Sequence, residues 1–204
     1  MDYVISLDRR QRKRQAVHQQ LLEAAERLFS ERGVARTTVD DIAEAADVAR
    51  QTFFNHFPYK EALAVELEAD GIQEVAQHAQ ALLEAGTPAL DVLQRTAEWV
   101  LERSIGDGDR AVVVARELLH PDPERARWAA EQIPLRAIFE AILVQAREEG
   151  TLRSDLPVQV VAARLSSVLR SIISQILLYD PEQLRRELAV CFDIVFNGIV
   201  DRST

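Results

Sequence analysis

The sequence predicts an all-α protein: an N-terminal three-helix domain with a helix-turn-helix, then a C-terminal helical bundle, about nine to ten helices in total. The first observation is composition, because 204 residues include only 7 Gly and 7 Pro, while the helix-forming residues Ala, Leu, Glu and Arg recur throughout. The second is periodicity, because apolar residues return at three- and four-residue steps between the few breaks. Too few turn signals remain for a many-stranded sheet.

The first domain, expected over residues 1–60, divides into three helices. The first is expected from Arg9 to Arg32, with Gly33 as its stop. Thr38 is the expected N-cap of a short second helix that ends near Ala46. A third helix over about residues 50–56 follows a tight turn.

Two features define that third helix. Asp47 occupies the turn before it, in a backbone conformation that Asp tolerates. Phe53 and Phe57, spaced i and i+4, are expected to face the core, and Pro58 ends the helix. Two short helices joined by such a turn form a helix-turn-helix, whose second helix enters the major groove of DNA.

The second domain is expected over residues 61–204. Gly and Pro residues between its apolar stripes predict where its helices begin and end. Thr87 is expected to cap one helix and Asp122 another, and Pro134 to start or kink a third. Two long apolar helices finish the domain. The expected helices cover about residues 60–85, 88–104, 110–119, 123–133, 134–150, 157–178 and 181–201.

The net charge of −9 is unusual for a protein that binds nucleic acid, but it is unevenly distributed. Residues 1–60 hold ten Lys and Arg against nine Asp and Glu, whereas residues 61–204 hold fourteen against twenty-four. A basic arm beside a DNA-reading helix can neutralise phosphates whatever the total charge. The five residues of this basic arm are Arg9, Arg10, Arg12, Lys13 and Arg14. The alternative interpretation is that they are simply the solvent-exposed start of a helix.

Several classes of protein are not expected. The single cysteine, Cys191, excludes an internal disulfide and a cysteine-rich metal cage, and the four histidines lack metal-ligand spacing. No stretch of about 18 apolar residues is long enough to span a membrane. Residues 1–6 lack the pattern of a secretory signal. We therefore expect a cytoplasmic protein without a metal, a cofactor or contact with a membrane.

The polar side of the third helix is the candidate reading face. It offers Arg50, Gln51, Thr52, Asn55 and His56. Arg pairs with the guanine edge, and Gln and Asn can pair bidentately with adenine. These side chains therefore predict base-specific contact with double-stranded DNA, although Thr52 is equally well explained as a residue that stabilises the helix start.

Four segments, 22–33, 37–46, 48–57 and 60–63, together resemble the DNA-binding domain of the TetR family of transcriptional regulators. The match runs continuously over about residues 14–63, and the remaining chain agrees in length and helicity only. The resemblance implies that Thr38 caps the second helix and approaches a phosphate, that Arg50, Gln51, Asn55 and His56 face the groove, and that Lys60 reaches a phosphate from the start of the fourth helix.

Three positions depart from the family's pattern. Asp47 stands where the family usually has Gly, and Ala49 replaces a Ser or Thr that would cap the third helix. Phe54 replaces a Tyr, so a hydroxyl-to-phosphate bond is lost while packing of the ring against sugar remains. Tyr59 is a candidate to restore that phosphate contact. These changes affect DNA affinity more than the fold.

The resemblance also implies a homodimer on a palindromic operator, with the last two helices paired in a four-helix bundle. The candidate interface residues are Leu165, Val168, Ile172, Phe192, Val195 and Phe196. A small apolar or aromatic ligand is expected between helices of the second domain. The candidate pocket residues are Trp99, Phe139 and Trp128, for which a place in the core is the alternative.

Three functions remain open from the sequence. The first is a transcriptional regulator, usually a repressor, released by a ligand. The second is a DNA-binding regulator without an inducer, constitutive or controlled by a partner. The third and remotest is a helical enzyme with an accessory DNA-binding head, which the C-terminal half disfavours because it lacks a phosphate loop, a nucleophile elbow and a paired histidine–carboxylate cluster. We therefore do not expect an enzyme.

Overall fold

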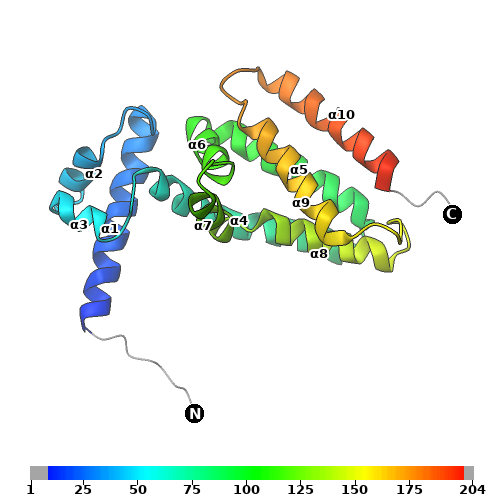
Figure 1. Cartoon of the computed structure of the whole chain (residues 1–204), viewed down its shortest axis with the longest axis horizontal. Helices are drawn as coiled ribbons and strands as arrows, with labels where there is room; N and C mark the ends of the chain where they lie inside the picture. The colour runs from blue at the N-terminus through cyan, green and yellow to red at the C-terminus, as the bar shows by residue number, and fades with distance from the viewer. Residues whose placement is uncertain (1–8, 200–204) are drawn as a thin grey trace, which may run out of the picture. The chain divides into compact units, whose positions relative to one another are not determined.

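The computed structural model describes residues 9–199, apart from the side chains at positions 70 and 199. Residues 1–8 and 200–204 lie outside the described residues. They include residues 1–6, for which no secretory signal is expected, and the predicted helix end at Asp201. Ten α-helices make up the described part (Figure 1): α1 Arg9–Arg32, α2 Val39–Ala45, α3 Arg50–Phe54, α4 Glu61–Glu84, α5 Ala89–Asp107, α6 Asp109–Leu118, α7 Pro123–Gln132, α8 Leu135–Glu148, α9 Val158–Ile173 and α10 Pro181–Ile199. The predicted all-α fold is confirmed.

The chain forms two compact units, the first ending at Leu67 and the second beginning at Glu68. The sequence placed this boundary at residues 60 and 61, where the chain enters α4. The structure extends the first unit by two helical turns because Ala62, Leu63 and Val65 are fully buried. Helix α4 therefore begins in one unit and ends in the other.

In the first unit, α2 packs against α1 and α3 packs against α2. The interior of this unit holds Leu21 and Ala25 from α1, Ile42 from α2 and Phe53 from α3, all fully buried. The bounds of α1 match the predicted ones, because an apolar stripe spaced for a helix ends at a glycine with a φ of 81°.

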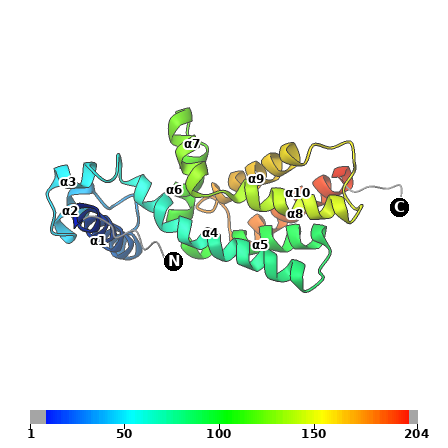
Figure 2. The ribbon, with the colours of Figure 1, turned by 90° about the horizontal axis from the view of Figure 1, so that it is seen from below.

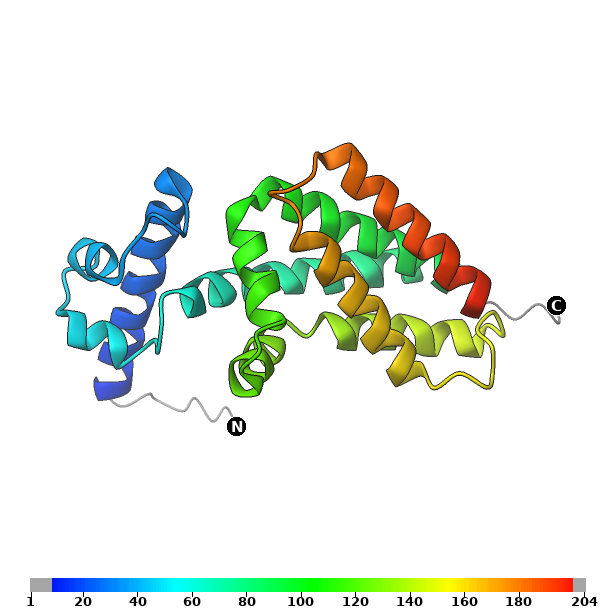
Figure 3. The same ribbon diagram turned by 45° about the horizontal axis from the view of Figure 1, so that its top comes forward.

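The second unit is a bundle in which α8 packs against α9 and α5, while α10 lies along α9 and α5 (Figure 3). Helices α6 and α7 pack on each other, and α7 projects from the bundle (Figure 2). The core is mainly apolar, and its buried side chains include Leu93, Phe139, Leu143, Leu165 and Leu169.

Tertiary contacts changed two predicted helix ends. Thr87 was expected to cap α5, but the N-cap is Pro88, and the Ala89 N–H donates instead to Oε2 of Glu149 at 3.0 Å. That prediction was wrong because the acceptor comes from 60 residues away. Helix α9 ends at Ile173, five residues before the predicted end, and the chain continues as turns.

The predicted cap of α7 is confirmed, because the Asp122 side chain accepts from the Glu124 N–H at 2.9 Å. Within residues 9–199, no helix is long and apolar enough to cross a membrane. The described side chains also form no group of three or more His, Cys, Asp or Glu arranged to hold a metal ion.

Candidate functional site

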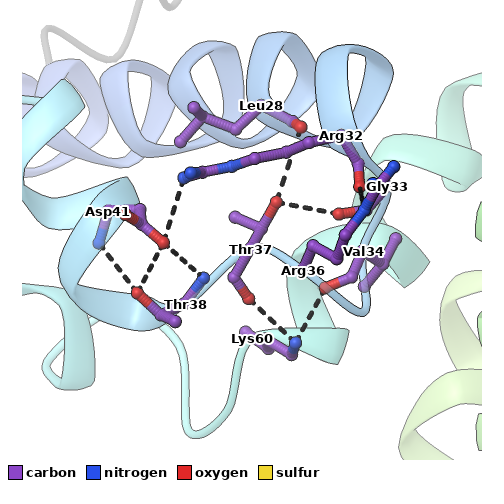
Figure 4. Close-up of polar contacts among 9 residues, drawn as sticks. All are labelled: Leu28, Arg32, Gly33, Val34, Arg36, Thr37, Thr38, Asp41 and Lys60. Carbon is purple, nitrogen blue, oxygen red and sulfur yellow. Dashed lines mark hydrogen bonds and ion pairs between the residues drawn. The ribbon is translucent and has the colours of Figure 1, made fainter.

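The start of α2 is stabilised by a reciprocal capping box. The Thr38 hydroxyl accepts from the Asp41 N–H at 3.2 Å, and the Asp41 carboxylate accepts from the Thr38 N–H at 2.8 Å (Figure 4). Arg32 adds an ion pair to the same carboxylate at 3.0 Å. The Thr38 hydroxyl also donates to the Asp41 carboxylate at 2.6 Å. That bond, followed by the one from the Thr38 N–H, lowers the pKa of Asp41. The predicted cap is confirmed, and it sets the direction in which α2 leaves α1.

Lys60 joins the loop between α1 and α2 to the beginning of α4. Its ammonium donates to the carbonyl oxygens of Val34 at 2.7 Å and Thr37 at 2.9 Å (Figure 4). The Thr37 side chain is fully buried, and its hydroxyl donates to the Gly33 carbonyl at 2.9 Å. Two of the three ammonium hydrogens are therefore engaged inside the unit, which leaves one for the predicted phosphate contact.

The turn between α2 and α3 is tight. Asp47 has a φ of 52°, the left-handed conformation predicted for it, and the Val48 N–H donates to the Ala43 carbonyl at 2.9 Å. Ala49 is the N-cap of α3 and supplies no side-chain hydrogen bond, as its sequence predicts. The geometry of α3 therefore depends on this turn and on side-chain packing.

Helix α3 has one buried side and one exposed side. Phe53 is fully buried, and Phe57, one turn further, is 1% exposed, with ring centroids 5.9 Å apart. The predicted reading residues lie elsewhere on the helix or just after it: Arg50, Gln51, Phe54 and Asn55 are exposed, and Thr52 and His56 are half-buried. Because the phenylalanines are anchored, the polar side is held outward as a continuous surface.

Arg50 is positioned by two neighbours in this surface. Its Nη1 lies 2.5 Å from Oδ1 of Asp40 on α2, and its guanidinium carbon lies 5.4 Å from the centre of the Phe54 ring. Sequence reasoning missed Asp40, which lies in the first turn of α2. Gln51 and Asn55 also interact, at 3.4 Å.

His56 lies against α1. Its ring centroid is 5.7 Å from that of His18, which in turn stacks on Phe57 at 4.6 Å and contacts Glu66 at 2.5 Å. Burial lowers the pKa of His56, and the charges of His18 and Arg14 lower it further. At neutral pH His56 therefore presents a neutral imidazole, which can both donate and accept hydrogen bonds.

The remaining predicted contacts are placed as follows. Tyr59 is half-buried beside the start of α4. The basic arm forms the first turns of α1, and all five of its cationic side chains are exposed: Arg9, Arg10, Arg12, Lys13 and Arg14. A helical arm with every charge in solvent is suited to phosphate contact.

The second unit contains a small pocket between α4, α5, α6 and α9. Its cavity volume is about 50 Å³. Ten of its lining residues are apolar and four are polar. The polar ones are Glu68, Arg103, Ser104 and Arg170.

None of the three predicted pocket residues lines this cavity. Phe139 is fully buried in the core of α8, and Trp99 stacks on His78 with ring centroids 5.3 Å apart. Trp128 is half-buried on α7. This cavity is lined mainly by aliphatic side chains, together with Arg103 and Arg170. Helix α9 carries two arginines, of which Arg164 is exposed and Arg170 lines this cavity, and the sequence alone does not separate them.

The predicted dimer residues divide into two groups. Leu165, Ile172 and Phe192 are at most 3% exposed, because they pack in the core of their own chain, so they have no surface to offer a second chain. Val168, Val195 and Phe196 are partly buried around the same core. Three other apolar residues of α9 and α10, Val160, Val190 and Ile194, are exposed.

Comparison with known proteins matches both units. Residues 21–67 match the family model for bacterial regulatory proteins of the tetR family, and residues 69–198 match the model for the C-terminal domain of TetR/AcrR family transcriptional repressors. Together the two models cover almost the whole described chain.

Individual relatives agree. The repressor AcnR of Corynebacterium efficiens is 29% identical over 161 residues, 78% of this chain and 80% of that protein. The repressor DhaR of Mycobacterium sp. is 27% identical over 190 residues, which cover 92% of this chain and 94% of that protein. The crystal structure of Thermus thermophilus FadR, a TetR-family repressor in complex with lauroyl-CoA, has a TM-score of 0.82 and 32% identity, and covers 91% of this chain and 96% of that one.

Proposed function

This chain belongs to the TetR/AcrR family of transcriptional repressors, and we propose that it is a one-component repressor whose homodimer is released from a palindromic operator by a ligand of the second unit. The observation behind the proposal is the two-sided α3. Its phenylalanine side is locked into the first unit, and its polar side presents Arg50, Gln51 and Asn55 to solvent. Such a helix fits the major groove, where these side-chain types distinguish bases.

The direct test is selection of bound fragments from a random DNA pool at physiological salt. We expect a palindrome with half-sites one helical turn, ~34 Å, or a multiple apart, because a two-fold dimer presents two reading helices. Enrichment of no sequence, at low or at moderate salt, would contradict the proposal.

Arg50→Ala is expected to relax base preference at one position of each half-site. A bidentate arginine–guanine contact discriminates by about 1–3 kcal/mol, so affinity for the best site should fall by on the order of 10- to 100-fold while affinity for random DNA changes little. Fluorescence anisotropy with operator and scrambled duplexes measures both. Arg36→Ala, which removes an exposed arginine outside the reading face, is the control. An equal loss on both duplexes would make Arg50 a phosphate contact.

Dimerisation is proposed through the outer faces of α9 and α10. Val190 and Ile194, one helical turn apart on α10, are 59% and 66% exposed, and Val160 on α9 is 51% exposed. Exposed apolar residues grouped on two neighbouring helices favour contact with a second copy of the same surface. The proposal moves the interface from the buried residues expected from sequence to these exposed ones.

The double variant Val190→Glu, Ile194→Glu is expected to be monomeric, because four carboxylates would meet in the paired surface. Light scattering after gel filtration should report half the wild-type mass, and operator affinity should fall by on the order of 100-fold or more as bivalent binding is lost. Val144→Glu, at an exposed valine of α8, should leave mass and affinity unchanged. A double variant that keeps the wild-type mass would rule out this interface.

The ligand is proposed to be a long-chain acyl compound. Thermus thermophilus FadR binds lauroyl-CoA, and the pocket of this chain is lined mainly by aliphatic side chains. Ligand pockets usually enclose roughly 300–1,000 Å³, so a cavity of about 50 Å³ must open before an acyl chain enters. Occupancy of the pocket is therefore coupled to the conformation of the second unit, because the ligand binds the open state and shifts the population toward it.

The small cavity also favours the second candidate, a regulator without an inducer. Titration of lauroyl-CoA into the complex of the protein with its selected operator separates the two. Release of DNA supports the inducible repressor. No release at concentrations where the ligand is monomeric, together with no binding to the free protein, supports the alternative.

A further inference from the structure

The pocket wall contains one arginine that differs from its neighbours. Arg103 and Arg110 each face carboxylates: Arg103 lies 3.3 Å from Glu68 and 2.8 Å from Glu74, and Arg110 lies 2.6 Å from Asp107. Their charges are matched inside the second unit. Arg170 has no carboxylate within ion-pair distance among the described residues, and its one hydrogen bond is to the Ser167 hydroxyl, at 3.0 Å.

Arg170 is nevertheless largely removed from water. Its side chain comes from α9, is half-buried, and lines the pocket beside Ile173. Its Nε is buried and has no hydrogen-bond partner among the residues that the structure describes. Burial with no compensating charge lowers the pKa of Arg170. Keeping an unpaired guanidinium in an apolar wall costs free energy, and an anion placed against it would recover that cost.

The one acid among the described residues that line this pocket does not serve as this anion. Glu68 lines the same pocket, but its two oxygens face Arg103 at 3.3 Å and Arg110 at 3.6 Å. Burial raises the pKa of Glu68, and the charge of Asp107 raises it further. Among the described residues that line the pocket, the charge of Arg103 is matched by that of Glu68, so Arg170 leaves the lining itself with a formal charge of +1.

We propose that Arg170 binds the anionic group of the ligand, so that the pocket selects amphipathic anions, with an apolar chain against its aliphatic lining and a carboxylate or phosphate against the guanidinium. The inference rests on the proposed ligand-released repressor and specifies the chemistry that its pocket recognises. A planar guanidinium matches both anions, because it can donate two parallel hydrogen bonds to either.

The test is calorimetric titration of the full chain with three twelve-carbon probes below their aggregation concentrations: laurate, lauroyl-CoA and dodecanol. For the wild type we expect binding of at least one anionic probe and much weaker binding of dodecanol. Arg170→Gln should weaken binding of the anionic probe by on the order of 10- to 100-fold, as expected for loss of hydrogen bonds to a charged group. Its affinity for dodecanol should be unchanged. Arg170→Lys should restore part of the affinity. Binding of laurate assigns the site to carboxylates, and binding of lauroyl-CoA alone assigns it to phosphates.

Arg164→Gln is the matched control, because Arg164 lies on the same helix and is exposed. It should bind every probe as the wild type does. Thermal unfolding should show Arg170→Gln to be at least as stable as the wild type, since an unpaired buried charge has been removed. Equal affinity of an anionic probe for wild type and Arg170→Gln would overturn the proposal, and so would equal affinity of the wild type for dodecanol and the anions. Dissociation of Arg170→Gln into monomers would assign the guanidinium to a second copy and also overturn it.

Measuring whether each probe releases the operator distinguishes failure of the Arg170 proposal from failure of the proposed repressor function. If dodecanol displaces DNA as well as laurate or lauroyl-CoA does, the repressor is inducible but Arg170 does not select its ligand. If no probe binds and none displaces DNA, both the inducible repressor and the role of Arg170 are refuted.

Discussion

Phe53→Ala is expected to unfold the first unit and abolish operator binding while the second unit stays folded. Phe53 is fully buried, and removing a buried phenylalanine costs about 3–5 kcal/mol. That is a large part of the stability of a unit of this size, since units of about 60 residues are only marginally stable. DNA binding is lost with the fold, because α3 is anchored by this side chain.

The positions of the tryptophans make the measurement specific. Trp99 and Trp128, the two tryptophans of the chain, both lie in the second unit, so their fluorescence reports that unit alone, whereas far-ultraviolet circular dichroism reports both. In urea, Phe53→Ala should lose part of its helical signal early and keep the wild-type fluorescence midpoint. Phe54→Ala, at a neighbouring ring that is 40% exposed, should unfold within about 0.5 kcal/mol of the wild type. Coincident transitions of the two probes in Phe53→Ala would show that the units unfold as one.

Lys60→Met is expected to weaken the first unit and DNA binding together. The ammonium donates to two carbonyls, and hydrogen bonds to a charged group contribute about 1.5–3 kcal/mol each. Allowing for the half-exposed site, we expect a loss of about 2–4 kcal/mol in the free energy of unfolding of the first unit. Because methionine keeps most of the apolar stem of lysine, the loss in the free energy of unfolding measures the contribution of the ammonium group.

Lys13→Met is the matched control, because Lys13 is the other lysine of the chain and is exposed on α1. Both variants remove one positive charge, and each removes about one phosphate contact from the salt dependence of DNA binding if the predicted contacts form. Only Lys60→Met should lower the urea midpoint. Equal stability of the two variants would mean that the bonds to Val34 and Thr37 contribute nothing, and that Lys60 serves DNA alone.

Some parts of the candidate site could be predicted because their causes are local. The Thr38 cap, the left-handed Asp47 and the uncapped Ala49 depend on residues within three or four positions, whose backbone geometry is nearly the same in any helix-turn-helix. The two faces of α3 also follow from spacing. Asp40 was missed because the partner of Arg50 lies ten residues away, across the turn between two helices.

The second unit was predicted less completely. Its helices are visible as apolar stripes, but a stripe does not say which of its residues face the chain's own core and which face a partner. Leu165, Ile172 and Phe192 were therefore assigned to a dimer and are found in the core. Trp99 was assigned to a pocket and stacks on His78 of α4, 21 residues earlier.

The sequence by itself determined the all-α class, the bounds of α1, and a helix-turn-helix whose candidate reading residues follow from a period of 3.6. It also identified the acidic charge as belonging to the second half of the chain. Only the tertiary structure decided that Glu149 meets Ala89, that Lys60 holds two carbonyls of the α1–α2 loop, and that Arg170 lies unpaired in an apolar wall. The physical reason is that capping and amphipathicity act within one or two helical turns, whereas the partner of a buried charge is set by which helices pack together.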